Sequence, residues 1–187
     1  MRLVTKRPDQ VQRADAQRNR ARILAAAGKA FAEIGAHVPL DDIARSAGTG
    51  NATLYRHFAT RDLLLKAVYD ERINQLAAAA SANADGTSKQ QLLDWLGHLV
   101  EFLTRDRGLH DAYRELDDPE IAKRWQATLR RAAKPLVAAS IQSGSLPKTF
   151  KFEELTTLMH GIAIAASGDV RQARRLLQLA ASGFISR

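Results

Sequence analysis

The sequence contains no cysteine among its 187 residues. This absence excludes a scaffold held by disulfides and any metal site with cysteine ligands. No apolar run approaches the length of about 20 residues that spans a bilayer. The N-terminal segment MRLVTKRPDQVQR is polar and basic, without the apolar stretch of a signal peptide. We therefore expect a cytoplasmic protein that has no membrane partner.

Recognisable catalytic motifs are missing as well. The five histidines are scattered, with no two of them four residues apart: His37, His57, His98, His110 and His160. Neither H-E-x-x-H, nor G-x-S-x-G, nor a phosphate-binding glycine loop occurs. Acidic and seryl residues stand mostly at expected helix starts, where capping explains them. The sequence predicts no enzyme, no metal and no cofactor.

The net charge of +8 is unevenly distributed. Residues 1–60 carry 10 Lys and Arg against 5 Asp and Glu, whereas residues 61–187 carry 18 against 15. Most of the positive excess lies in the first third, which is typical of an end that contacts DNA. Residues 1–14 carry four Lys and Arg and few large apolar side chains, and they predict a flexible basic arm. Such arms follow phosphates or enter the minor groove in some DNA-binding families. The alternative is a solvated tail that is basic by chance.

The segment 40–68, LDDIARSAGTGNATLYRHFATRDLLLKAV, has the pattern of a helix–turn–helix. Four apolar residues stand at the spacing of one helix face, namely Leu40, Ile43, Ala44 and Ala47. The sequence Gly48-Thr49-Gly50 ends this helix, since glycine adopts left-handed backbone angles at little cost. A second short helix is expected from about Asn51 to His57. Two short helices joined by a tight glycine turn place the second helix in the major groove.

These residues closely resemble the TetR family of transcriptional regulators over roughly residues 20–69. The resemblance is carried by Leu40-Asp41-Asp42-Ile43-Ala44, by Ala47-Gly48, and by Thr53-Leu54-Tyr55-Arg56-His57-Phe58 with Arg61 and Leu64 beyond. Two positions depart from the family pattern. Thr49 stands where the family usually has an apolar residue, and Ala59 stands where close relatives often have proline. The alternative is an ordinary helical hairpin in an all-α core.

The second helix of the motif is the expected DNA reader. Its N-terminal end enters the groove, so Thr49, Gly50, Asn51 and Ala52 should lie nearest the base edges. Asn51 can bind adenine in a bidentate manner, and the methyl groups of Ala52 or Thr49 can touch a thymine methyl. Tyr55 presents a hydroxyl to a base or a phosphate. The resemblance implies phosphate contacts at Thr53, His57 and Arg61. Alternatively, Asn51 only caps the helix and His57 only packs.

The rest of the chain also predicts helices, so the expected class is all-α. The first helix should run from near Asp15 to Ile34, burying Ile23, Leu24, Ala27, Phe31 and Ile34, and ending at Gly35. A linking helix follows from about Arg61. We divide the chain into a flexible basic arm (1–14), a three-helix DNA-binding domain (15–60), and a linking helix with a ligand-binding and dimerisation bundle (61–187).

Within the second half, three local signals set the expected boundaries. Residues 81–88, SANADGTS, have a linker's composition, and Ser88 with Gln91 predicts a capping box that starts the next helix. Asp118-Pro119 predicts the start of a long helix. Pro135 should kink or break this long helix.

The last two helices have the pattern of an interface. Alternating spacings of three and four residues make an a/d seam in the final helix, consisting of Val170, Ala173, Leu177, Ala180 and Phe184. The family's usual dimer is a four-helix bundle of the last two helices of each subunit, so the resemblance implies a homodimer through this seam. The alternative is that the seam packs only inside the monomer.

The second half should also hold a pocket for a small molecule. An apolar pocket with a few polar groups is expected from Trp95, Leu99, Phe102, His110, Tyr113, Trp125, Leu129, Met159 and His160. For any one of these residues, a plain core position is the better interpretation, and the pocket is favoured for the set as a whole by the resemblance to the TetR family. The resemblance then implies a sequence-specific regulator, most readily a repressor released from a palindromic operator on double-stranded DNA by a small-molecule inducer. The alternative is a basic or architectural DNA-binding protein without ligand control.

Overall fold

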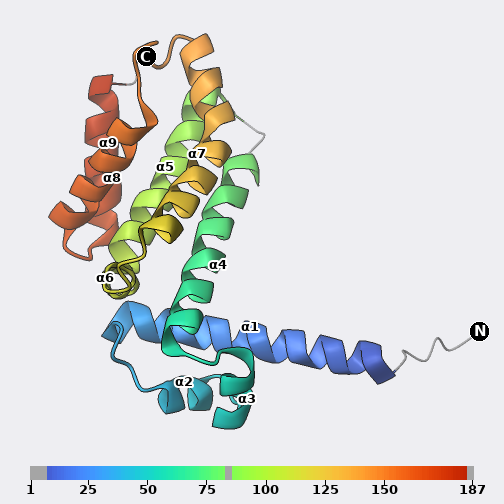
Figure 1. Cartoon of the computed structure of the whole chain (residues 1–187). Helices are drawn as coiled ribbons and strands as arrows, with labels where there is room; N and C mark the ends of the chain where they lie inside the picture. Colours follow the sequence, from blue (N-terminus) through green and yellow to red (C-terminus); the bar gives the residue numbers. More distant parts are fainter. Residues whose placement is uncertain (1–7, 83–85, 185–187) are drawn as a thin grey trace, which may run out of the picture.

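The computed structural model describes residues 8–82 and 86–184, and these residues form helices and no strands. The helices of the described residues are α1 (Pro8–Ile34), α2 (Leu40–Ser46), α3 (Asn51–His57), α4 (Arg61–Ala82), α5 (Ser88–Arg105), α6 (Arg107–Arg114), α7 (Pro119–Gln142), α8 (Phe152–Ala166) and α9 (Val170–Phe184). Figure 1 shows α1, α2 and α3 at one end and α4 rising from them into a bundle with α5–α9. The predicted all-α class and two-part architecture are confirmed.

The small N-terminal domain is held together by apolar residues from all three of its helices. Ile23, Ala27 and Phe31 of α1 are fully buried, as are Ile43 of α2 and Leu54 of α3. The spacing of the α1 residues is that of one helix face, so one continuous apolar face of α1 packs against α2 and α3. This core holds α3 against α1 and α2.

In the C-terminal bundle, α5 is the central helix. It contacts α4, α6, α7, α8 and α9. Leu92, Leu96 and Val100 are fully buried along it, and Trp95 is almost fully buried on a neighbouring face. A helix packed on several sides needs a wider apolar face than a single stripe, which is why α5 is apolar over much of its circumference.

The first helix begins earlier than the sequence predicts. It starts at Pro8, so residues 8–14 are helical and are not a flexible arm. Proline is tolerated at the first helical position because it lacks only an N–H that would have no partner. Gln, Arg and Ala, which dominate residues 12–17, are good helix formers and need no apolar contacts. Residues 1–7 of the predicted arm lie outside the described residues.

Three further expectations need correction. Ile34, expected in the core, is 64% exposed, because α1 ends there and the chain turns away at Gly35. The cap of α5 is Thr87, whose hydroxyl accepts a hydrogen bond from the Gln90 amide, and Ser88 lies inside the helix. Pro135 does not break α7. The Pro135 position is exposed, so water can satisfy the backbone carbonyl that loses its helical partner.

Candidate DNA interface and ligand cavity

The reader helix α3 presents its N-terminal end to solvent. Gly50 is the N-cap residue, with an extended backbone, and no side chain caps the helix. Asn51 and Ala52 are exposed, and Tyr55 is 48% exposed although it is a large aromatic residue. Thr49 and Thr53 are half-buried. The predicted base-contacting residues therefore lie together at one exposed helix end.

Arginines of α1 hold the turn and the end of the hairpin. Gly48 has a left-handed φ of +61°, which ends α2 and which other residues rarely adopt. The Arg22 guanidinium donates to the Gly48 carbonyl at 3.1 Å and occupies the space where a side chain at Gly48 would lie. Arg20 lies over the Phe58 ring, 5.5 Å from its centroid. Near the expected DNA surface, Arg22 thus holds the turn and Arg20 contacts the end of α3.

Asn51 is not the cap of α3. Its side-chain amide donates to a carboxylate oxygen of Asp41 at 2.8 Å, which joins the starts of α2 and α3. The Asn51 carbonyl oxygen is left to accept a hydrogen bond, and the second amide hydrogen is left to donate. This is the pair of groups that a bidentate contact to adenine requires.

Two residues predicted to bind phosphates are partly buried within the domain. The Arg61 guanidinium donates to the carbonyls of Ala36 at 2.7 Å and Val38 at 2.5 Å, so it fastens the loop between α1 and α2 to the start of α4. The Nε2 atom of His57 is buried and has no hydrogen-bond partner among the described residues. Burial, together with the positive charges of Arg56 and Arg20, lowers the pKa of His57. A neutral His57 binds a phosphate less strongly than a cation would.

The C-terminal bundle contains a cavity of about 380 Å³ between α4, α5, α6, α7 and α8, and this cavity is partly open to solvent. Seven of the nine residues predicted for the pocket line it: Leu99, Phe102, His110, Tyr113, Trp125, Leu129 and His160. The other two belong to the core. Trp95 donates its indole N–H to the Leu76 carbonyl at 3.0 Å, and Met159 is fully buried.

An aromatic cluster forms one wall of the cavity. Tyr69 of α4 stacks on Trp125 of α7, with ring centroids 4.2 Å apart and planes 19° apart. Tyr113 of α6 and Phe102 of α5 pack on the same tyrosine, at 4.7 and 5.5 Å. The sequence analysis did not identify Tyr69. Consecutive apolar residues before it place apolar groups on several sides of α4, so the pattern does not show which side faces the bundle. Its central place in the cluster makes the linking helix itself part of the cavity wall.

Two histidines and a buried tyrosine supply polar atoms to the cavity, beside the side chains of Gln126, Thr156 and Thr157. The Tyr69 hydroxyl and Nδ1 of His110 are 2.7 Å apart, and burial raises the pKa of Tyr69 far above its usual range. Burial, assisted by His160, lowers the pKa of His110 to about 4. His110 is therefore neutral at physiological pH. On α8, Nδ1 of His160 lies 2.7 Å from the Thr156 carbonyl.

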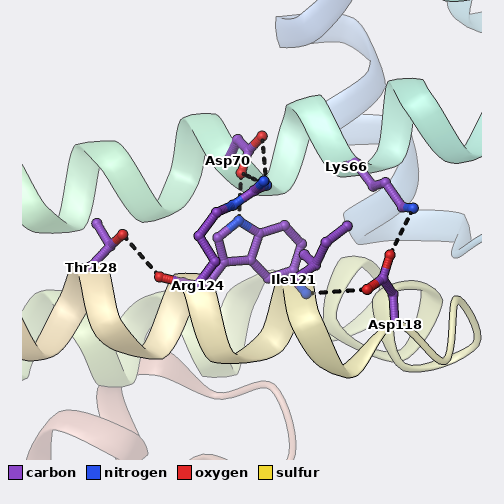
Figure 2. Close-up of polar contacts among 7 residues, drawn as sticks. Lys66, Asp70, Asp118, Ile121, Arg124 and Thr128 are labelled. Atoms are coloured by element: carbon purple, nitrogen blue, oxygen red, sulfur yellow. Dashed lines mark hydrogen bonds and ion pairs between the residues drawn. The ribbon is translucent and has the colours of Figure 1, made fainter.

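Three polar contacts join α4 to α7 and to the residue before it, beside this wall (Figure 2). Asp70 of α4 accepts from the Trp125 indole at 2.5 Å and from Arg124 at 3.0 Å. One turn earlier on α4, the Lys66 ammonium pairs with Asp118 at 3.0 Å, just before α7 begins. The helix that carries the cavity wall is thus joined directly to the helix that leads to the DNA-binding domain.

The second connection to the DNA-binding domain is a close contact between α6 and α1. A Cβ atom on Gly108, in the first turn of α6, would lie 2.6 Å from the carbonyl oxygens of both Phe31 and Ala32. Only glycine allows the two backbones to approach this closely. Because α6 also carries His110 and Tyr113, one short helix contacts both the cavity and α1.

The predicted dimer seam mostly faces inward. Ala173 and Leu177 are buried within the single chain, where α9 packs on α5 and α8, and Val170 and Ala180 are half-buried. The side chain of Phe184 lies outside the described residues. The prediction of this seam as the interface is therefore wrong for Ala173 and Leu177. The exposed large apolar residues of these two helices are Leu158, Ile164 and Leu179.

Comparison with known proteins assigns the family. Residues 23–68 match the model for bacterial regulatory proteins of the tetR family, and residues 87–185 match the model for the C-terminal domain of SbtR-like transcriptional regulators. A TetR transcriptional regulator from Streptomyces coelicolor is 30% identical, with a TM-score of 0.75, over 89% of this chain and 98% of that one. The chain belongs to the TetR family of transcriptional regulators.

Two other solved structures extend the comparison. A TetR regulator from Mycobacterium vanbaalenii is also 30% identical, with a TM-score of 0.73, over 94% of this chain and 99% of that one. LfrR from Mycobacterium smegmatis, solved in complex with proflavine, is 23% identical, with a TM-score of 0.67, over 91% and 98%, a likeness of fold. Among curated proteins, none matches the chain.

Two classes of feature are absent from the part of this TetR-family chain that the structure describes. No three His, Asp or Glu side chains gather where they could hold a metal ion. None of the described helices is both long enough and apolar enough to cross a membrane.

Proposed function

We propose that this regulator is a homodimeric, cytoplasmic repressor that binds a palindromic operator and leaves it when a small molecule fills the cavity. The observation that carries the proposal is the double role of α6. It lines the cavity with His110 and Tyr113, and it packs Gly108 against the carbonyl end of α1. A ligand that needs more room beside α6 must change the contact with the DNA-binding domain.

We assign recognition of the DNA base sequence to the exposed N-terminal end of α3. Gly50, Asn51 and Ala52 carry no contact that would keep them from a base edge, apart from the single Asn51–Asp41 hydrogen bond. Thr49, Thr53 and Tyr55 stand beside them and supply hydroxyl groups for bases or phosphates. In this arrangement the base contacts specify the sequence and the phosphate contacts set the register.

The dimer is assigned to the outer faces of α8 and α9. Ile164 and Leu179 are large aliphatic residues that are 69% and 61% exposed in the single chain. Leu158, Gly161 and Ala165 continue the same face of α8 and are also exposed. A second copy that covers this face would form a four-helix bundle and place the two α3 helices on the same side of the dimer. Their separation must be about 34–36 Å to meet successive major grooves.

Release follows from the connections of the cavity wall. Tyr69 and Asp70 of α4 hold Trp125 by stacking and by a hydrogen bond, and α6 contacts α1. A ligand that binds more tightly to a state with displaced α4 and α6 shifts the population away from the DNA-binding spacing. LfrR, which shares this fold, was solved in complex with proflavine, and this supports small-molecule binding by a protein of this fold.

The test is selection of binding sites from random double-stranded DNA by the full-length protein. The expected product is a palindrome whose half-site centres lie 10–10.5 base pairs, or a multiple, apart. Asn51→Ala should relax the preference at one position per half-site by about 1–3 kcal/mol. Asn74→Ala, at an exposed asparagine of α4, is the matched control and should leave the preference unchanged. Binding without sequence preference but with a steep salt dependence would instead indicate an architectural DNA-binding protein.

A further inference from the structure

The two histidines of the cavity lie close together on different helices. The ring centroids of His110 (α6) and His160 (α8) are 5.4 Å apart, and both rings line the cavity. In each ring Nδ1 is engaged by a neighbouring group, and no hydrogen bond to Nε2 is found among the residues that the structure describes. The group that is bound at Nδ1 determines whether Nε2 of the same ring can donate or accept a hydrogen bond with a ligand.

His110 offers a hydrogen-bond donor. Tyr69 is buried, and its hydroxyl has Nδ1 of His110 as its hydrogen-bond partner at 2.7 Å. If the imidazole donated, the phenolic proton would be left in an apolar wall without an acceptor, which costs about 1–3 kcal/mol. The hydroxyl therefore donates to Nδ1. A neutral imidazole with a lone pair on Nδ1 carries its proton on Nε2.

His160 offers the opposite group. Its Nδ1 lies 2.7 Å from the Thr156 carbonyl, which can only accept. Nδ1 therefore carries a proton, which leaves Nε2 as the ring atom that can accept a hydrogen bond. The cavity thus presents one donor and one acceptor from adjacent rings.

The charged groups around the cavity are already paired. Among the described residues, the charged ones that line it are Arg130 and Glu153, and these two form an ion pair with each other. Behind the aromatic wall, Asp70 is bound by Arg124 and by the Trp125 indole. Neither a cation nor an anion would find an unpaired opposite charge there. The stacked rings of Tyr69 and Trp125 favour a flat apolar ligand.

We propose that the cavity takes a small, neutral, flat molecule that carries a hydrogen-bond acceptor and a donor side by side, as in a lactam or amide joined to an aromatic ring. The acceptor of the ligand meets Nε2 of His110, and its donor meets Nε2 of His160. The volume of about 380 Å³ is at the lower end for ligand pockets, which fits a bicyclic compound. The inference rests on the proposed function for the use of the cavity as a ligand site.

The test is calorimetric titration of the full-length protein with matched bicyclic probes. 2-Quinolinone has the lactam donor and acceptor, 1-methyl-2-quinolinone lacks the donor, and naphthalene lacks both groups. Proflavine serves as a flat cation. 2-Quinolinone should bind about three- to tenfold more tightly than each of the other three, since one net hydrogen bond contributes a factor in that range.

Two variants locate the preference in the histidines. His160→Phe, at an exposed residue that the fold does not need, should abolish the preference for 2-quinolinone over its methyl derivative while leaving the naphthalene affinity nearly unchanged. His98→Phe, at an exposed histidine of α5 outside this cavity, should keep the preference.

Each contrary result has its own meaning. Equal binding of the three neutral probes, or tightest binding of proflavine, would overturn the proposed ligand class and leave the cavity as a ligand site. Persistence of the preference in His160→Phe would remove that histidine as the acceptor and overturn the assignment. The absence of binding by all four probes would overturn the ligand class and also count against ligand-controlled release.

Discussion

The contact between α6 and α1 predicts a large effect from the smallest possible substitution, Gly108→Ala. The new Cβ would lie 2.6 Å from the carbonyl oxygens of Phe31 and Ala32, so the helices must separate by several tenths of an ångström. Overpacking of this kind costs about 1–3 kcal/mol. For a chain of this size, the melting temperature should fall by about 2–12 °C. Thermal denaturation of the full-length protein measures the change.

A control separates the contact from the ordinary effect of replacing glycine in a helix. A Cβ on Gly97, in the middle of α5, would meet nothing within 4 Å outside its own helix. Gly97→Ala should therefore raise the stability by about 0.5–1 kcal/mol through helix propensity alone. If Gly108→Ala stabilised the protein as Gly97→Ala does, α6 would not be held tightly against α1, and the proposed route from cavity to DNA would lose its main support.

Three other predictions follow from the contacts. Arg61→Ala should lower the free energy of unfolding, measured in urea, by about 1.5–3 kcal/mol, because two charge-assisted hydrogen bonds to the α1–α2 loop are lost. Unchanged stability together with a smaller salt dependence of DNA binding would instead indicate that Arg61 binds a phosphate. Leu179→Glu should give a folded monomer in light scattering, whereas Leu177→Glu should unfold the protomer by burying a charge. A dimer of the Leu179→Glu variant would exclude the outer faces of α8 and α9 as the interface. The pKa of His110 is lowered to about 4, so the unfolded state binds more protons between pH 6.5 and 4 and stability falls with pH in that range. His110→Gln should lose less melting temperature between pH 7 and pH 4.5 than the wild type, and parallel losses would contradict this.

The helix–turn–helix could be predicted from the sequence because all of its signals are local. The apolar residues of α2, the left-handed Gly48 and the short α3 lie within a few turns of each other. Such signals depend on backbone preferences and on the spacing of one helix face, and distant parts of the chain do not change them. The role of Arg61 is different, since its partners belong to a loop more than 20 residues earlier.

The α9 seam shows why orientation is harder to predict than helix position. Helix α9 has apolar residues on two faces, and periodicity alone does not say which face packs inside the protomer. The fold places Ala173 and Leu177 inside and leaves Leu179 exposed. Tyr69 was missed for a related reason. Only the packing of α6 and α7 against α4 makes it the centre of the aromatic cluster.

Trp125 stacks on Tyr69 and donates its indole N–H to Asp70, and this environment gives the protein a built-in spectroscopic probe. The indole N–H of Trp125 is bound to a carboxylate of α4, whereas Trp95, the other tryptophan, binds a backbone carbonyl in the core. In a Trp95→Phe background, the intrinsic emission would come from Trp125 alone. Any separation of α7 from α4 would expose that indole to water and shift its emission to longer wavelength. The distance between these two helices can then be followed in solution during binding, without an attached label.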